Sequence, residues 1–295
     1  MAGKESSVVE LVIEGRRRDI GGFEVRRILP FAKRRMVGPF IFLDEMGPLV
    51  LPADQGLDVP PHPHIGLATV TYLFAGEIQH RDSLGVVQAI RPGAVNWMTA
   101  GRGIVDSGGS GEAERASASP LHGLQSWVAL PLEQEEAEAA FSHHAAKDLP
   151  CIEGEGSRLR LIAGRAYGET SPVPSFSELF YVDAELSPGA GLSLPDDHPE
   201  RAVYVVEGSV RIGGQPVVAG EMAVVKAGAA PCLTAGPASR PMLLGRAPLD
   251  ARRHIWWNFV SSRPERIEQA KADWRASRFA PVPGETEFVP LPEGP

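Results

Sequence analysis

The sequence predicts an all-β protein of two barrel-like domains, with one short helix near the C-terminus. Three observations lead to this prediction. Glycine and proline are abundant, with 32 and 27 residues, and they separate short runs of Val, Ile, Leu and Thr. A pattern of strands and glycine turns occurs twice, and only one stretch has a clear helical period. Many short strands divided by turns are typical of sandwiches and barrels.

Strands are expected where β-branched and aromatic residues cluster between turn residues. In the first half these runs are FEVRRILPF, GLATVTYLFAGEI, GVVQAI and AVNWM, and in the second half they are RAVYVVEGSVRIGG, PVV and MAVVKAG. The lengths of the runs and of the gaps between them are those of short strands joined by tight turns.

The β pattern is repeated. The first copy reads HPHIGLATVTYLFAGE followed by RPGAVNWM, and the second reads HPERAVYVVEGSV followed by VAGEMAVV. Each copy begins with His-Pro and continues through a strand, a glycine turn, a strand and a second glycine hairpin. The boundary falls in AAKDLPCIEGEGS, so we expect an N-terminal domain over residues 1–147 and a C-terminal domain over residues 148–295.

Two stretches are expected to be helical. In SSRPERIEQAKADW, Ser262 and Glu265 have the spacing of a capping box, and Pro264 suits a first helical turn. The apolar residues that share one face of this helix are Ile267, Ala270 and Trp274. The second stretch, Leu132–Ala146, is acidic and has little apolar face.

Composition excludes several classes of partner. The formal net charge is −8 and the pI is about 5.6, which disfavours direct binding to nucleic acid or to an anionic membrane. Cys151 and Cys232 are far apart and form no redox motif. No signal core or membrane-length apolar run is visible, so we expect a cytoplasmic protein. Closed barrels leave few sheet edges to pair, which favours a monomer.

The most distinctive local feature is VPPHPHIGLATVTYL, where His62 and His64 flank Pro63. Side chains two apart on a strand point to the same face, so both imidazoles can bind one metal ion. Two ligands do not complete a metal site, and the remaining ligands must come from elsewhere in the chain.

Longer strings resemble a known family. HPHIGLATVTYL, IQHRDSLG, NWMTAGRGI, LHGLQSWVALP, GETSPV and IWWNFVSSRPERIEQAKADW are together similar to the pirin family of two-cupin proteins, from about residue 17 to residue 290. The resemblance implies two cupin (jelly-roll-type) β-barrels packed face to face. It also implies iron, or another divalent transition metal, in the N-terminal barrel and no metal in the C-terminal barrel.

The family's metal ligands are only partly present. Pirins hold the metal with the two histidines of H-P-H, here His62 and His64, and with a His-x-Glu after the G-R-G loop. In this chain Asp106 replaces that third histidine and Gly108 replaces the glutamate. Cupins in general offer a glutamate four residues after the second histidine, and that position is Ala68, which we expect on the same strand face as His64.

Two interpretations of the site follow. In the first, His62, His64 and Asp106 form a triad of two imidazoles and one carboxylate with open coordination positions, as in non-haem iron enzymes. Aspartate is shorter than histidine, so this requires its strand to lie close by. Glu77 or Glu112 would be a distant additional ligand. In the second, the metal has been lost and the histidines bond to Asp106 or to water.

The other histidines are expected to be structural. His80 either lines the pocket as a proton carrier or forms a pair with Asp82 at a strand end, and we favour the pair. His122 is expected at a strand entry. On the helix expected at Leu132–Ala146, the adjacent residues His143 and His144 point about 100° apart, so we do not expect them to share a metal. In the second repeat His198 is followed by Glu200 in place of a second histidine.

Three classes of function remain open, and the resemblance implies the first two. The first is a dioxygenase of the quercetin 2,3-dioxygenase type, in which a metal binds the flavonol oxygens and O₂ adds across the heterocycle. Its pocket wall is expected to contain Phe74, Trp97 and Met98, whereas Trp256 and Trp257 are expected to be packing residues. The second class is a regulatory protein that acts through a protein partner. The third is a metal-free barrel that binds a small molecule. The altered ligands favour a weak dioxygenase or one of the two non-enzymatic classes.

Overall fold

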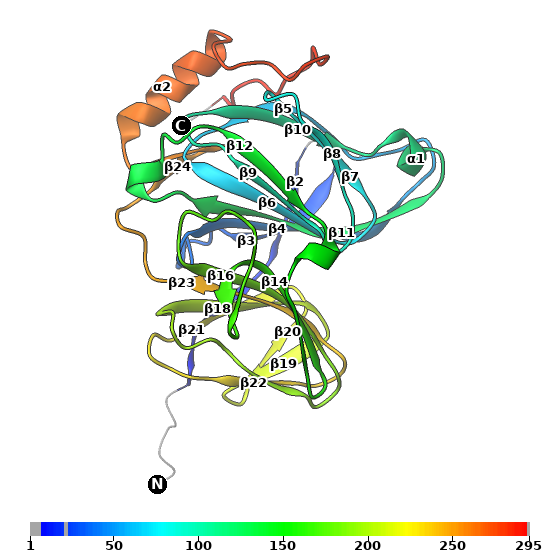
Figure 1. Ribbon diagram of the computed structural model, residues 1–295, viewed down its shortest axis with the longest axis vertical. Coiled ribbons are helices and arrows are strands. Elements are labelled where there is room, and N and C mark those ends of the chain that lie inside the picture. Colours follow the sequence, from blue (N-terminus) through cyan, green and yellow to red (C-terminus); the bar gives the residue numbers. More distant parts are fainter. Residues whose placement is uncertain (1–6, 21–22, 294–295) are drawn as a thin grey trace. The chain divides into compact units, whose positions relative to one another are not determined.

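The computed structural model describes residues 7–20 and 23–293. This part of the chain consists mainly of β-strands joined by short turns (Figure 1). The all-β class predicted from the sequence is therefore confirmed. The packing of the two barrels against each other stays a prediction.

The chain divides into two compact units, and neither is continuous in sequence. The C-unit, as we name it, comprises Met1–Arg17, Arg26–Phe42 and Lys147–Pro248. The N-unit comprises Arg18–Val25, Leu43–Ala146 and Leu249–Pro295. The chain passes from the N-unit to the C-unit between Ala146 and Lys147, one residue before the predicted boundary at 147/148. The division into domains at that boundary stays a prediction.

The C-unit contains two sheets. The larger sheet has eight strands, seven of them in the order β1-β21-β18-β23-β16-β14-β13, with β15 paired to β14. Its strands are β1 (Val9–Glu14), β13 (Cys151–Gly154), β14 (Ser157–Ala166), β15 (Glu169–Thr170), β16 (Leu179–Leu186), β18 (Glu200–Glu207), β21 (Glu221–Val225) and β23 (Arg240–Arg246). The smaller sheet has the order β17-β22-β19-β20. Its strands are β17 (Gly191–Ser193), β19 (Ser209–Ile212), β20 (Gln215–Val218) and β22 (Cys232–Ala235).

A seven-stranded sheet and a four-stranded sheet form the barrel that contains most of the N-unit; residues 16–17, 26–29 and 40–42 of the longer sheet are assigned to the C-unit. The long sheet has the order β12-β9-β6-β11-β4-β3-β2. Its strands are β2 (Arg16–Asp19), β3 (Glu24–Leu29), β4 (Phe40–Leu51), β6 (Leu67–Ala75), β9 (Val95–Thr99), β11 (Ser119–Ala129) and β12 (Ala140–His144). The short sheet has the order β5-β10-β7-β8. Its strands are β5 (Asp58–His64), β7 (Ile78–Asp82), β8 (Val87–Ile90) and β10 (Ile104–Gly109).

The remaining elements are small. Strands β24 (His254–Trp256) and β25 (Phe259–Ser261) form a hairpin, and a short helix, α1, covers Glu112–Arg115. The C-terminal helix α2 covers Pro264–Arg275. Neither helix in the described part of the chain has the length and apolar character needed to cross a bilayer.

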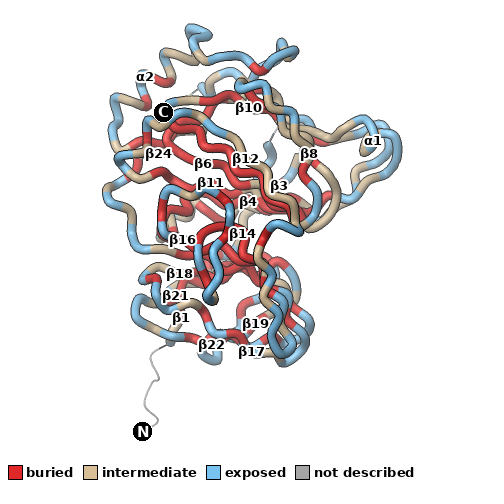
Figure 2. The backbone as a smooth tube through the Cα atoms, in the orientation of Figure 1, coloured by how far each residue is buried: buried red, intermediate tan, exposed pale blue. Residues whose placement is uncertain are grey.

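Alternation of side chains along the strands builds the cores, and the strand segments of both units are largely buried (Figure 2). In the C-unit the core includes Leu161, Val203 and Leu243, all fully buried. The N-unit has a core around Leu73 and Ile90. Burial on both sides of the strands accounts for the apolar runs seen in the sequence.

Helix α2 was predicted correctly, but its cap was not. Ile267 and Ala270 are buried against Phe259 and Trp274 packs at the edge of that cluster, so the expected face is confirmed. The helix begins at Pro264 with Arg263 as the N-cap and has no side-chain capping bond. The predicted capping box at Ser262 is therefore wrong.

The helix predicted at Leu132–Ala146 is also wrong. The structure has a 3₁₀ turn at Leu132–Gln134, the strand β12, and a second 3₁₀ turn at Ala146–Asp148. A stretch without an apolar stripe gains little from packing as a helix. As a strand it adds an edge to β9, with Phe141 opposite Met98 in register.

Candidate metal centre

The two histidines of H-P-H lie on β5, and their side chains point into the barrel of the N-unit. His64 has a side chain only 2 % exposed, and that of His62 is 16 % exposed. Nδ1 of His62 lies 2.9 Å from the carbonyl oxygen of Pro60, so Nδ1–H donates to this oxygen. That bond leaves Nε2 of His62 as the nitrogen that faces Asp106 and can bind a metal.

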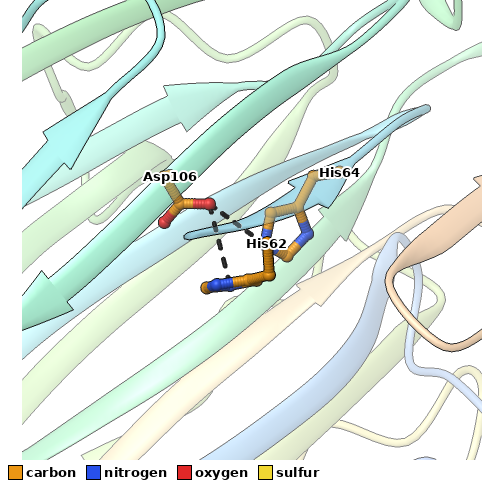
Figure 3. Close-up of side chains that lie close together, drawn as sticks. All are labelled: His62, His64 and Asp106. Atoms are coloured by element: carbon orange, nitrogen blue, oxygen red, sulfur yellow. Dashed lines mark ion pairs between the residues drawn. The ribbon is translucent and has the colours of Figure 1, made fainter. Parts of the chain in front are cut away.

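Asp106 lies on β10, which pairs directly with β5 and places Asp106 opposite His62. Its Oδ1 lies 3.2 Å from Nε2 of His64 and 3.7 Å from Nε2 of His62 (Figure 3). The short reach of aspartate is therefore compensated by its strand, which is the immediate neighbour of the histidine strand. The structure brings together all three residues predicted from the sequence.

The spacing of the three side chains fits a transition metal. One ligand atom from each lies within 4.8 Å of the others. Two ligands about 2.1 Å from one ion, at the angles of octahedral or tetrahedral sites, are roughly 3.0 to 3.4 Å apart. The two distances to Asp106 Oδ1 are close to that range. Two nitrogens and one carboxylate oxygen are also the donor set of non-haem iron sites.

The protonation states also suit metal binding. Burial lowers the pKa of His64, and the nearby Asp106 carboxylate offsets this only in part. Burial by itself would raise the pKa of Asp106, but the imidazoles of His62, His64 and His80 outweigh it and hold that pKa well below its usual range. At neutral pH His64 is therefore neutral and Asp106 is ionised, and both are in the form that a metal requires.

His80 lies on β7, beside the three candidate ligands. Its Nε2 is 3.0 Å from Oδ2 of the buried Asp82, as predicted, and its Nδ1 is 3.9 Å from Oδ2 of Asp106. The ring stacks on Phe141 with centroids 4.6 Å apart. His80 thus pairs with Asp82, as favoured from the sequence, and it also lines the pocket. Its role as a proton carrier stays a prediction.

The three candidate ligands open into an internal chamber of about 120 Å³ between the two sheets of the N-unit. Met98 lines it, as predicted, but Phe74 and Trp97 do not. The alternation of side chains along β9 explains the error for Trp97. Its two neighbours in the strand, Asn96 and Met98, face the chamber, so the side chain of Trp97 lies on the opposite face. From the long sheet, the lining residues are Met46, Thr69, Thr71, Asn96, Met98, Gln125, Trp127 and Phe141.

The chamber contains no carboxylate in the place of the family's fourth ligand. Gly108 lines the chamber, and a β-carbon there would lie 3.8 Å from Ile78 Cγ2, with no left-handed backbone to restrict it. Ala68 does not line the chamber, contrary to expectation. His64 ends β5 and Ala68 lies on the next strand, β6, so the alternation of side chains does not continue from one to the other. Thr69 lines the chamber wall instead. Glu77 is paired with Arg91 at 2.6 Å and is not among the three clustered residues, nor is Glu112.

The other histidines lie outside the candidate metal cluster. His122 Nε2 lies 3.0 Å from the buried Glu45, which supports a structural role. His143 and His144 are on β12 rather than on a helix, and adjacent strand residues face opposite ways. His198 in the C-unit packs against Phe180. No second cluster of three metal-binding side chains occurs among residues 7–20 and 23–293.

Sequence reasoning missed several polar residues of the chamber. Asn96, Thr71 and Gln125 lie on three neighbouring strands of the long sheet and line the same chamber as the candidate ligands. Only the alternation of AVNWM gives a hint, since it places Asn96 on the same face as Met98. Which face that is depends on the barrel rather than on the local sequence.

Comparisons with known proteins agree with this architecture. The family model described as Pirin matches residues 22–128, and the one described as the pirin C-terminal cupin domain matches residues 181–280. A solved quercetin 2,3-dioxygenase from Acinetobacter baumannii superimposes with a TM-score of 0.90 at 31 % identity, covering 97 % of this chain and 95 % of that one.

Two relatives are similar along most of their length. A pirin-like protein of Caulobacter vibrioides is 50 % identical over 290 residues, covering 97 % of this chain and 100 % of the relative. A Pseudomonas aeruginosa protein provisionally named quercetin 2,3-dioxygenase is 41 % identical over 256 residues, covering 86 % and 79 % of the two chains. The chain is a two-cupin protein and belongs to the pirin family.

Proposed function

We propose that the chain is a metal-dependent oxidoreductase of the quercetin 2,3-dioxygenase type, with His62, His64 and Asp106 as its metal ligands. The observation that carries the proposal is the convergence of two imidazole nitrogens and one carboxylate oxygen within 4.8 Å of one another inside a chamber. The names of two similar proteins support the reaction type.

The charges of the site favour an anionic oxygen ligand. Two neutral imidazoles and one carboxylate leave a divalent ion with a net positive charge, and three protein ligands leave coordination positions open. When bound, the metal would supply a Lewis acid for a substrate oxygen and for O₂ chemistry. Trp127 and Met98 give that end of the chamber an apolar wall.

His80 is placed to take a proton from the substrate. Asp82 accepts the Nε2–H of His80 at 3.0 Å and also accepts the backbone N–H groups of Leu84 and Val86. This arrangement fixes the ring, leaving Nδ1 as the nitrogen that faces the chamber. A substrate hydroxyl near Asp106 would lie within reach of Nδ1.

We expect weaker activity than that of a pirin with four protein ligands. Loss of a group that supports a bound metal typically reduces metal affinity or activity by about 10-fold to 100-fold. Here the fourth ligand is missing, since Gly108 supplies no side chain.

The test is metal analysis and oxygen uptake after anaerobic iron loading. Wild type should retain iron through gel filtration and consume oxygen slowly with quercetin, and both properties should be lost in His62→Ala and Asp106→Asn. His254→Ala, on the hairpin strand β24, is the control and should behave as wild type. Wild type that retains no iron, or turnover that survives both ligand substitutions, would rule out the proposed function.

A second candidate is a metal-free binding protein. Asp106 Oδ1 lies 3.2 Å from Nε2 of His64, so these two side chains are close enough to interact directly without a metal. In that case the chamber would bind a small molecule, or the protein would act through a regulatory protein partner. The same iron analysis separates these candidates from the oxidoreductase.

A further inference from the structure

Two neighbouring rows of side chains cross the long sheet beneath the candidate metal ligands. In the first row, Trp127 is opposite Thr69, Thr69 opposite Met98, and Met98 opposite Phe141. His64 contacts Trp127 edge to face with centroids 5.3 Å apart, and His80 stacks on Phe141. The metal end of the chamber therefore lies over this first row, which is mostly apolar.

The second row is polar. Gln125 is opposite Thr71, Thr71 is opposite Asn96, and Asn96 is opposite His143. Each member lies two residues along its strand from a member of the first row, which is a separation of roughly 7 Å. Thr71 Oγ1 donates to Gln125 Oε1 at 2.8 Å, and His143 Nδ1–H donates to Asn96 Oδ1 at 2.7 Å.

Asn96 is left with a donor that has no acceptor. The residue is only 3 % exposed, and its side chain lines the chamber. Its Nδ2 has no hydrogen-bond partner among the residues that the structure describes. Because His143 fixes the carboxamide through Oδ1, the unpaired Nδ2 group is directed toward the chamber. A buried N–H group without an acceptor is costly, so we expect Asn96 Nδ2 to donate to water in the empty chamber and to an acceptor atom of a bound ligand.

The size of the chamber limits what that ligand can be. Its volume is about 120 Å³. This is slightly below the roughly 150 Å³ of a cavity that accommodates benzene, and far below the roughly 300 Å³ at which pockets for drug-sized ligands begin. One aromatic ring against Met98, Trp127 and Phe141 therefore fills the chamber, and a three-ring flavonol exceeds its volume, which is a second reason to expect slow oxidation of quercetin.

We propose that the chamber binds a single-ring aromatic diol, with its two oxygens at the metal ligands and an oxygen acceptor across the ring bonded to Asn96 Nδ2. The proposal rests on the proposed function for the metal end and adds the substrate class and a specificity-determining residue. A carbonyl across a benzene ring from a pair of hydroxyls matches the spacing of roughly 7 Å between the two rows.

The experiment measures binding to full-length protein loaded with nickel under anaerobic conditions, by quenching of tryptophan fluorescence. The probes are catechol, 3,4-dihydroxybenzaldehyde and 3-hydroxyflavone. Wild type should bind the aldehyde more tightly than catechol, and 3-hydroxyflavone should bind at least about tenfold more weakly than the aldehyde because it exceeds the chamber.

Substitutions at Asn96 isolate the acceptor contact. Asn96→Ala removes the donor, and Asn96→Asp replaces it with a carboxylate oxygen of nearly the same shape. In both variants the ratio of the catechol Kd to the aldehyde Kd should fall about tenfold, which is the value of one lost hydrogen bond. The ring electronics of the probes are the same in every variant, so the change in ratio reports on Asn96 alone. Gln88→Glu, an amide-to-acid change on β8 outside the chamber, should leave the ratio unchanged.

The outcomes separate the two proposals. Wild type that takes up no nickel counts against the proposed function. If the probe ratio of the nickel-loaded protein is the same in Asn96→Ala as in wild type, the Asn96 assignment is overturned. If wild type binds 3-hydroxyflavone as tightly as the aldehyde, the single-ring substrate class is overturned. Either result leaves the metal site intact. If Asn96→Asp does not fold, as judged by circular dichroism, Asn96→Ala decides the question.

Discussion

Glu135 and Arg253 form a buried ion pair that joins the end of the 3₁₀ turn Leu132–Gln134 to the C-terminal segment of the N-unit. Arg253 Nε lies 2.7 Å from Glu135 Oε1, and the two side chains are 0 % and 4 % exposed. Glu135 also accepts the backbone N–H and the hydroxyl of Ser262, each at 2.8 Å. This pair holds the start of α2 in place, which explains why Ser262 does not cap the helix.

We predict that Glu135→Gln destabilises the N-unit by about 3 to 5 kcal/mol, the usual cost of leaving one buried charge of a pair without its partner. Asp250 contacts Arg253 at 2.9 Å but is 42 % exposed, so it replaces little of the lost interaction. The double variant Glu135→Gln/Arg253→Met contains neither charge of this pair. Its loss of unfolding free energy relative to wild type should therefore be smaller than that of Glu135→Gln alone.

Urea unfolding followed by tryptophan fluorescence measures this directly, because all five tryptophans lie in the segments of the N-unit. Glu136→Gln is the matched control. Glu136 is 43 % exposed and pairs with Arg263 and Arg266 at the surface, so its loss should cost no more than about 1 kcal/mol. Equal midpoints for Glu135→Gln and Glu136→Gln, or a double variant less stable than Glu135→Gln, would refute the reasoning.

Three further predictions concern the metal site, the C-terminal helix and pH. Asp106→His with Gly108→Glu should raise iron retention markedly, since position 108 has room for a side chain; unchanged iron content by elemental analysis contradicts this. Trp274→Ala should cost about 3 kcal/mol in urea unfolding, because Trp274 packs at the edge of the α2 cluster and its Nε1–H donates to Val289 O at 3.0 Å; a loss below about 1 kcal/mol would show that the contact is unimportant. Burial lowers the pKa of His198, so the folded state disfavours its protonated form. The resulting penalty is absent above about pH 6.5 and grows as pH falls through the lowered folded pKa. His198→Gln should therefore lose less Tm than wild type between pH 7 and pH 5, and an equal loss in the two proteins speaks against this.

The parts of the fold that depend on local pattern were predictable from the sequence. Period-two alternation placed His62 and His64 on one face, and helical spacing identified α2. The role of Asp106 followed from the family resemblance, and the structure supplied the missing condition, since β10 is the neighbour of β5.

The errors have a common physical cause, which is contact between distant segments. β12 forms because β9 offers it an edge, and Ser262 is held by Glu135 rather than by the first turn of its own helix. The alternation of side chains in β5 does not continue into β6, because Gly66, with a φ of +69°, interrupts the extended backbone between the two strands. The row through Asn96 depends on the register of four strands, which no short stretch of sequence specifies.

The order of the segments along the chain has a consequence for how the protein is made. The C-unit has all of its residues once synthesis passes Pro248, whereas the N-unit also requires Leu249–Pro295. The unit with the candidate metal ligands is thus begun early and completed last, although those ligands lie in the first half of the chain. A gene cut at 147/148 would therefore encode two fragments, and neither would contain a whole unit.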